Sequence, residues 1–152
     1  MRISLLLTIT ITLIGALAQA KEYEHPQSTE ISVALSAMQR QASDKFVIVE
    51  LNGTENYFQY ASDGQDFFYF DVPKMSLSDE QLERATRFFS SQNVKKNVVI
   101  DSGGTYGAPR RIVSFQKTFK NQDVAAGVSL GLGFMIEVIG HEAGITIFRG
   151  WE

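Results

Sequence analysis

The sequence predicts an α+β domain: a two-layer sandwich in which an antiparallel sheet carries helices mainly on one face. Three observations favour this class. Short segments rich in β-branched and aromatic residues are separated by tight-turn signals, which is typical of antiparallel strands. Three other segments repeat their apolar residues at helical spacing. Because these helical segments interrupt the strands one at a time, the expected order of elements is α-β-β-β-α-β-β-α-β.

The chain begins with the features of a bacterial secretory signal peptide. Met1-Arg2 forms a short basic start, and residues 3–14 are largely apolar. Ala18 and Ala20 are the small residues that signal peptidase needs before the cleaved bond. The apolar run is shorter than the roughly 20 residues that span a bilayer. We therefore expect export to the periplasm with cleavage after Ala20, and no lipoprotein anchor, because no cysteine follows.

The expected mature chain is one domain, residues 28–152, after a polar and flexible lead-in at 21–27. The sequence contains no cysteine, which excludes disulfides, thiol chemistry and cysteine metal sites. The net charge is −3, and loss of Arg2 with the leader makes it −4. A mildly acidic domain binds nucleic acid and anionic lipid poorly. We expect no nucleic-acid partner and no membrane contact after signal cleavage.

The first half of the mature chain predicts a helix followed by a three-stranded meander. Ser28 or Thr29 can cap the helix. The expected strands are 46–51, 57–60 and 67–72, and their connecting turns are Asn52-Gly53 and Asp63-Gly64. The apolar positions at helical spacing are Ile31, Leu35, Met38 and Ala42.

The second half predicts two helices and three strands. Ser78 and Gln81 form a capping box at the start of one helix. The last helix starts at Asn121 or Asp123 and ends at Ile139, with Gly140 as its stop. The expected strands are 97–100, 111–115 and 144–148.

The meander is unusually aromatic, and strand alternation divides its side chains between two faces. If one set faces the helices, then Tyr57, Gln59, Phe67 and Tyr69 face away from them. Three helices are few to cover both faces, so an aromatic outer face indicates a contact surface. The alternative is that these side chains pack on loops or on the lead-in. We take Tyr57, Gln59, Phe67 and Tyr69 as candidate binding residues.

A glycine-rich loop at 101–109 separates two predicted strands. Its Asp101-Ser102-Gly103-Gly104 segment resembles the sequence around a chymotrypsin-type nucleophile, but those enzymes need two barrels and a triad from elsewhere. A turn between strands is the better interpretation. As a protruding loop it is a candidate binding element, with Tyr106, Arg110 and Arg111 as its binding residues.

The two histidines give little support for a metal or catalytic site. His141-Glu142 begins like a zincin motif, but no second histidine follows four residues later. His25 lies far from it in the sequence, in the lead-in. We therefore predict no catalytic residue, no metal site and no cofactor.

Charge is distributed unevenly along the chain, and the last helix is rich in glycine. For the charges, a solvated surface and a field that steers an oppositely charged partner both stay open. For Gly127, Gly131 and Gly133, close packing on the sheet is favoured over a helix-pairing face. The basic side chains concentrate at Lys95, Lys96, Arg110, Arg111, Lys117 and Lys120, and the acidic ones at Glu50, Glu55, Asp63, Asp66 and Asp71.

Four segments together resemble the TY-Chap proteins, relatives of type III secretion class I chaperones and of the YbjN-type fold. They are FVIVELNGTENYFQYA, FFYFDVP, LSDEQLERATRFF and EVIGHEAG, which fall within residues 28–148. The resemblance implies an α+β sandwich with helices on one face, dimerisation, and binding of peptide or unfolded protein. It implies no catalytic residues. Members of that family are usually cytoplasmic, whereas this chain carries an export signal.

Three functions follow as hypotheses. The first is an exported, non-enzymatic, protein- or peptide-binding domain of the bacterial envelope, chaperone-like in fold, with a homodimer as one assembly. The second is a periplasmic inhibitor or immunity protein that blocks a secreted hydrolase. The third is a small hydrolase that uses the glycine-rich loop. No constellation of titratable residues favours chemistry, so the first hypothesis leads.

Overall fold

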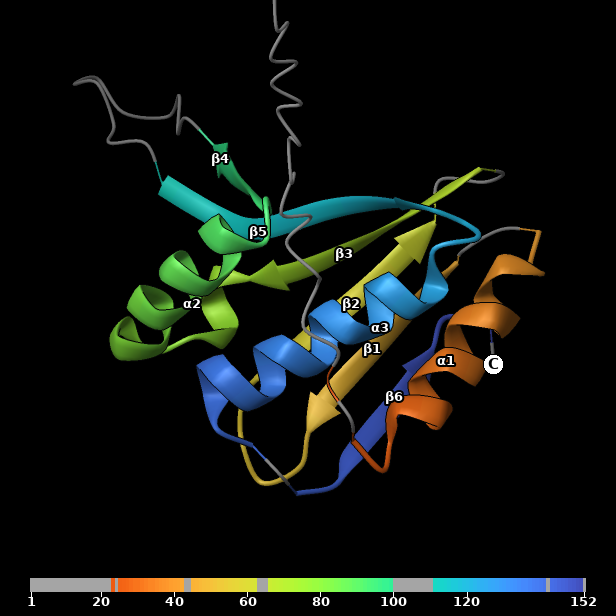
Figure 1. Cartoon of the computed structure of the whole chain (residues 1–152), viewed down its shortest axis with the longest axis horizontal. Coiled ribbons are helices and arrows are strands. Elements are labelled where there is room, and N and C mark those ends of the chain that lie inside the picture. Colours follow the sequence, from red (N-terminus) through yellow and green to blue (C-terminus); the bar gives the residue numbers. More distant parts are fainter. Residues whose placement is uncertain are drawn as a thin grey trace, which may run out of the picture.

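The computed structural model describes residue 23 and residues 25–42, 45–62, 66–99, 111–141 and 143–151. One six-stranded antiparallel sheet carries the helices on one side, so the predicted α+β sandwich is confirmed (Figure 1). The strand order is β4-β5-β3-β2-β1-β6. The helices are α1 (Ser28–Gln39), α2 (Asp79–Ser91) and α3 (Val124–Gly133), with a 3-10 turn at Lys74–Ser76 and a π-helical segment at Phe134–Ile139. The strands are β1 (Phe46–Leu51), β2 (Tyr57–Ser62), β3 (Phe67–Pro73), β4 (Lys95–Val99), β5 (Arg111–Lys120) and β6 (Ile145–Arg149).

The meander forms as the Asn52-Gly53 turn and strand alternation predict, and the predicted Asp63-Gly64 turn lies outside the described residues. Gly53 has a positive φ of 80°, the conformation that the Asn52-Gly53 signal provides between β1 and β2. Phe58 and Tyr60 of β2, and Phe68 and Phe70 of β3, are fully buried. These side chains alternate with partly or largely exposed ones, so the helix-covered face of the sheet carries the aromatic core.

The capping box of α2 is formed. Ser78 Oγ accepts a hydrogen bond from the Gln81 backbone N–H at 3.2 Å, and Gln81 Oε1 accepts one from the Ser78 N–H at 2.9 Å. Gln81 Nε2 also donates to Asn56 Oδ1 at 3.1 Å, which ties the helix start to the residue before β2. The cap therefore fixes α2 relative to the sheet as well as starting the helix.

Helix α3 lies close against the sheet because glycine faces it. A Cβ on Gly127 would stand 2.7 Å from the Phe68 ring, and one on Gly131 would stand 2.7 Å from the Phe58 ring. Real Cβ atoms do not approach other atoms so closely, so only glycine permits this helix–sheet distance. Close packing, the favoured interpretation of these two glycines, is confirmed. Gly133 instead leaves room for the rings of Tyr23 and Phe88.

The end of the last helix differs in type from the expectation. The helix reaches Ile139 and stops at Gly140, which has a left-handed φ of 71°, as predicted. Its last six residues, however, are π-helical rather than α-helical. The backbone N–H of His141 donates to the Met135 carbonyl at 3.0 Å, which closes this widened turn.

Several boundaries also differ by a few residues. The N-cap position of α1 is Gln27, without a side-chain cap hydrogen bond, rather than Ser28 or Thr29, because Pro26 and Gln27 form a turn in which the Ser28 N–H donates to the His25 carbonyl at 3.0 Å. Strand β4 starts at Lys95 instead of Asn97, and β5 runs to Lys120. Strand β5 pairs with both β4 and β3, and this pairing overrides the low strand propensity of lysine.

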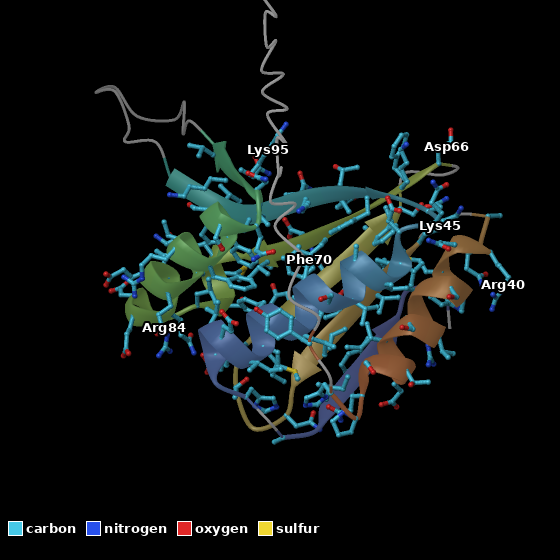
Figure 2. The ribbon with its side chains drawn as sticks, in the orientation of Figure 1. Arg40, Lys45, Asp66, Phe70, Arg84 and Lys95 are labelled. Atoms are coloured by element: carbon cyan, nitrogen blue, oxygen red, sulfur yellow. The ribbon has the colours of Figure 1, made fainter. Side chains whose placement is uncertain are left out.

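The core is a set of interlocking aromatic rings between the sheet and the helices. In Figure 2 Phe70 lies among the central elements, whereas the charged Arg40, Arg84 and Lys95 lie at the periphery. Phe89 of α2 is the hub, with its ring centroid 4.8 Å from that of Phe115 and 5.7 Å from that of Phe134. Such ring pairs add stabilisation beyond the buried area alone.

Across the ranges that the structure describes, no helix combines the length and the apolar character needed to cross a membrane.

Candidate functional site

The outer face of the sheet, opposite the helices, carries the four candidate residues of the meander. Tyr57 and Gln59 point outward from β2, and Phe67 and Tyr69 point outward from β3, as strand alternation predicts. Phe67 is 42 % exposed, and the other three are partly buried. The structure therefore gathers these four side chains on one surface, which we call the outer face.

Strand register sets the neighbours of these residues. Gln59 stands opposite Asp71 of β3, and its Nε2 donates to Asp71 Oδ2 at 2.9 Å. Tyr69 stands opposite Ala61, and Tyr57 stands opposite Glu50 of β1. The polar Gln59–Asp71 pair lies among these aromatic side chains.

Three further apolar residues complete the outer face, and the sequence did not single them out. Ile48 of β1 stands between Gln59 of β2 and Phe148 of β6. Phe148 is 48 % exposed, and Phe46 at the start of β1 is 39 % exposed. The segment 46–51 is apolar at nearly every position, so the sequence does not show which of its side chains face the helices and which face outward. The position of β6 beside β1 follows only from the folded topology.

The loop candidates are not brought to this surface by any described contact. Tyr106 and Arg110 lie outside the described residues, as does the predicted leader at 1–20. The backbone of Arg111 pairs with Val99 at the start of β5. Because Ser114 of β5 already stands opposite the last residue of β3, Arg111 lies beyond the end of that strand.

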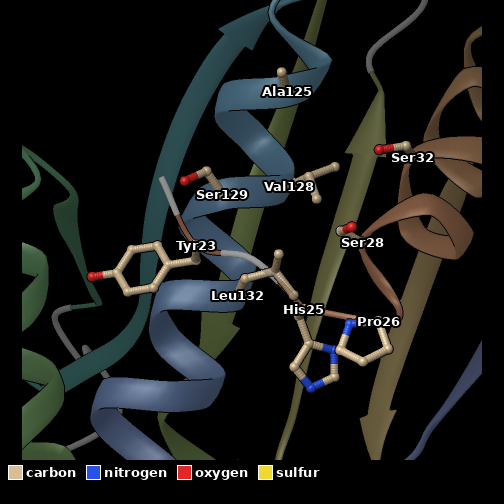
Figure 3. A pocket seen from close by; sticks show the side chains of 9 residues that line it. All are labelled: Tyr23, His25, Pro26, Ser28, Ser32, Ala125, Val128, Ser129 and Leu132. Atoms are coloured by element: carbon tan, nitrogen blue, oxygen red, sulfur yellow. The ribbon is translucent and has the colours of Figure 1, made fainter. Parts of the chain in front are cut away.

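A groove of about 660 Å³ runs between α1 and α3, on the helix side of the molecule (Figure 3). Ser28 and Ser32 of α1 form one wall, and Val128 and Leu132 of α3 form the other. No pattern in the sequence predicted this groove, because its walls come from segments about a hundred residues apart. It is also lined by Tyr23, His25, Pro26, Ala125 and Ser129.

Tyr23, in the predicted lead-in, is attached to the last helix. Its hydroxyl donates to Glu137 Oε1 at 2.6 Å, and its ring packs at Gly133. Burial raises the pKa of Tyr23, and the hydrogen bond and the negative charge of Glu137 raise it further. The chain before α1 is thereby held across one end of the groove.

Both histidines have local partners in the backbone. His25 Nδ1 accepts a hydrogen bond from the Gln27 N–H at 3.2 Å. His141 is 8 % exposed, and its Nε2 lies 3.1 Å from the Gly144 carbonyl oxygen. Among the described residues, no group of three or more His, Cys, Asp or Glu side chains is placed to hold a metal ion.

A second cavity, of about 490 Å³, lies at the β4–β5 hairpin, and we call it the lysine pocket. Lys117 Nζ donates to the Gln92 carbonyl at 2.6 Å and lies 5.6 Å from the centre of the Phe119 ring. Partial burial lowers the pKa of Lys117. The pocket is lined by Asn93, Lys95, Lys96, Asn97, Gln116, Lys117 and Thr118.

No protein-family model, no curated protein and no solved structure matches this chain. The resemblance to the TY-Chap proteins therefore stays a prediction. The described residues form three surfaces that a partner could occupy: the outer face, the α1–α3 groove and the lysine pocket.

Proposed function

We propose that this chain is an exported, non-enzymatic domain of the bacterial periplasm that binds protein or peptide through the outer face of its sheet. One observation carries the proposal. The helices cover one face of the sheet, and the other face presents aromatic and aliphatic side chains from β1, β2, β3 and β6.

The apolar part of this face is larger than scattered exposure requires. Phe46, Phe67 and Phe148 are each at least 39 % exposed. Ile48 of β1 lies between Phe148 of β6 and Gln59 of β2 on the same face. Single exposed apolar residues are normal, but a contiguous set indicates a surface used for binding. Aromatic side chains are enriched at protein interfaces because they bury a large area at low conformational cost.

Polar groups on the same face can orient a bound partner through hydrogen bonds. Glu50 and Thr146 are exposed on β1 and β6, and Gln59 is partly exposed on β2, where it hydrogen-bonds to the buried Asp71 of β3. An apolar centre with polar groups around it is typical of interfaces between proteins that also exist apart. The sheet surface suits an extended polypeptide or a flat partner better than a small molecule.

The predicted signal peptide supports the location. A domain exported without cysteines depends on its hydrophobic core for stability, and the aromatic core provides it. The inward and outward rings of the meander then have separate roles. The inward ones hold the fold, and the outward ones meet the partner.

The test uses the purified protein and a fluorescein-labelled, neutral, unfolded peptide rich in phenylalanine and leucine. We expect the Tyr57→Ala/Tyr69→Ala variant to weaken binding about fivefold, or about 1 kcal/mol, in fluorescence anisotropy. Circular dichroism should show an unchanged fold. Val33→Ala is the matched control, because Val33 is 58 % exposed on α1, away from the outer face. Unfolding of the tyrosine variant, or equal binding by both variants, would contradict the proposal.

A further inference from the structure

We infer that the lysine pocket receives acidic side chains of the bound polypeptide, so that the partner carries a short acidic segment beside its apolar residues. This inference rests on the proposed function, because it names the chemistry of the partner that the outer face would hold. It assigns a role to a cavity that the aromatic surface alone does not explain.

The lining of the pocket has the composition of an anion site. All seven residues that line it are polar or charged, three of them are lysines, and none is acidic. The amides of Asn93, Asn97 and Gln116 add groups that both donate and accept hydrogen bonds. A carboxylate can accept from the ammonium and amide donors, and a peptide backbone can use the remaining amide groups.

No ion pair joins a lysine of the pocket to an acidic side chain in the described part of the chain. The ion pairs recorded among these residues are Arg84–Glu80 and Arg87–Glu83, both on α2. Lys117 donates only to a backbone carbonyl, and desolvation alone shifts its pKa. Lys117 is partly removed from water, and such a charge without an ion-pair partner attracts an anion more strongly than the exposed Lys95 and Lys96 do.

The pocket continues the outer face across the sheet. Gln116 of β5 stands opposite Asp71 on one side and Lys95 on the other, and Thr118 stands opposite Tyr69. Lys95 and Gln116 are therefore on the same side of the sheet as Gln59 and Tyr69. Lys96, opposite the buried Phe115, and Lys117, opposite the buried Phe70, stand on the helix side, with Lys117 at the edge where α2 ends. The positive charge thus lies at one border of the aromatic surface.

Strand spacing sets the length of a partner that reaches both features. Asp71 lies two strands across from Lys95, which is about 10 Å at the spacing of neighbouring strands, and Tyr69 is two residues further along β3, so Lys95 and Tyr69 are about 12 Å apart. An extended chain covers that distance in about three residues. The acidic segment of the partner should lie about three residues from an apolar residue that contacts Tyr69.

Long-range electrostatics favour a short acidic peptide segment over a polyanion. The chain carries 17 acidic and 14 basic side chains, so its overall field repels nucleic acid and anionic lipid. A few carboxylates can still bind where the local field is positive, because screening limits repulsion to about 10 Å at 0.1 M salt.

The experiment compares two fluorescein-labelled peptides with the purified protein by fluorescence anisotropy. Both peptides contain a Phe-Leu pair, and three residues later one has three glutamates and the other three glutamines. We expect the glutamate peptide to bind about tenfold more tightly at low salt, which corresponds to about 1.4 kcal/mol. Raising the salt to 0.5 M should remove most of this difference.

The lysines are tested by Lys95→Gln/Lys96→Gln, both exposed on β4. This variant should bind the two peptides equally. Lys74→Gln/Arg40→Gln is the matched control, since it removes the same charge from exposed positions outside the pocket and should keep the preference. Phe148→Ser should weaken both peptides to the same degree, because Phe148 belongs to the outer face.

The outcomes separate this inference from the function on which it rests. Equal binding of the two peptides, or a glutamate preference that survives Lys95→Gln/Lys96→Gln, overturns the acidic-partner inference and leaves the proposed function standing if Phe148→Ser still weakens binding. Absence of binding by either peptide overturns both. Lysine-dependent binding to phosphatidylglycerol vesicles in place of the glutamate peptide also overturns the inference.

Discussion

The hydroxyl of Tyr60 shows how a polar atom is accommodated in an aromatic core. Tyr60 is fully buried, and its hydroxyl donates to the Gly127 carbonyl of α3 at 2.9 Å. Burial raises the pKa of Tyr60 above its ordinary value of 10.0. The neutral tyrosine therefore stabilises the fold fully below pH 10, and this stabilisation is lost as the pH rises above the unfolded-state value.

Tyr60→Phe should lower the free energy of unfolding at pH 7 by about 1 kcal/mol, because one buried hydrogen bond is lost and the Gly127 carbonyl loses a partner. The variant should also lose less stability than the parent between pH 9 and pH 11. Urea unfolding at both pH values measures the two effects. Tyr23→Phe is the comparison variant: the pKa of Tyr23 is also raised, so its loss of stability between pH 9 and pH 11 is measured beside that of Tyr60→Phe. A parent and a Tyr60→Phe variant with the same alkaline decline would contradict this account.

Gly131 is a residue at which an ordinary helix rule should reverse. Alanine in a helix is usually about 1 kcal/mol more stable than glycine. Here the new Cβ would stand 2.7 Å from the Phe58 ring, inside a packed core. We expect Gly131→Ala to destabilise the domain by about 1–3 kcal/mol in urea unfolding. A gain in stability would show that α3 does not lie so close to the sheet.

The start of α2 carries a prediction at the scale of an element. Ser78→Ala removes the side-chain acceptor of the capping box and should cost about 1 kcal/mol in thermal or urea unfolding. Ser90→Ala, an exposed serine in the last turn of the same helix, should cost much less. Equal losses from the two variants would mean that the cap contributes nothing specific.

Elements with strong local signals could be predicted from the sequence, and elements defined by pairing could not. The Asn52-Gly53 turn and the Ser78 box are local chemistry, so β1, β2 and the start of α2 are where the sequence places them. Strand β4 begins with Lys95-Lys96, which no local preference marks as a strand. It forms because β5 offers a partner along its whole length.

At the scale of the whole molecule, the outer face was predictable only in part. Alternation within β2 and β3 is enough to place Tyr57 and Tyr69 away from the helices. It does not reveal Phe46, Ile48 or Phe148, because their grouping needs β6 beside β1. The lysine pocket has the same cause. Six of its seven residues come from β4 and β5, and which of them stand side by side depends on the register of that pair, which is not visible in the sequence.

The proposed division of the sheet into a helix-covered face and a partner-binding face leads to one expectation for the whole molecule. Binding should perturb outward residues of four strands together while the helices stay unchanged. The α1–α3 groove, on the opposite side of the sheet, is the competing location within the described structure.

The most direct test is a backbone amide NMR titration of the ¹⁵N-labelled protein with the neutral peptide rich in phenylalanine and leucine. We predict that the amide shifts concentrate at Ile48, Gln59, Tyr69 and Phe148, and that Ser32 and Ser129 in the groove do not move. Shifts confined to the groove residues, with the outer face unchanged, would contradict the central claim.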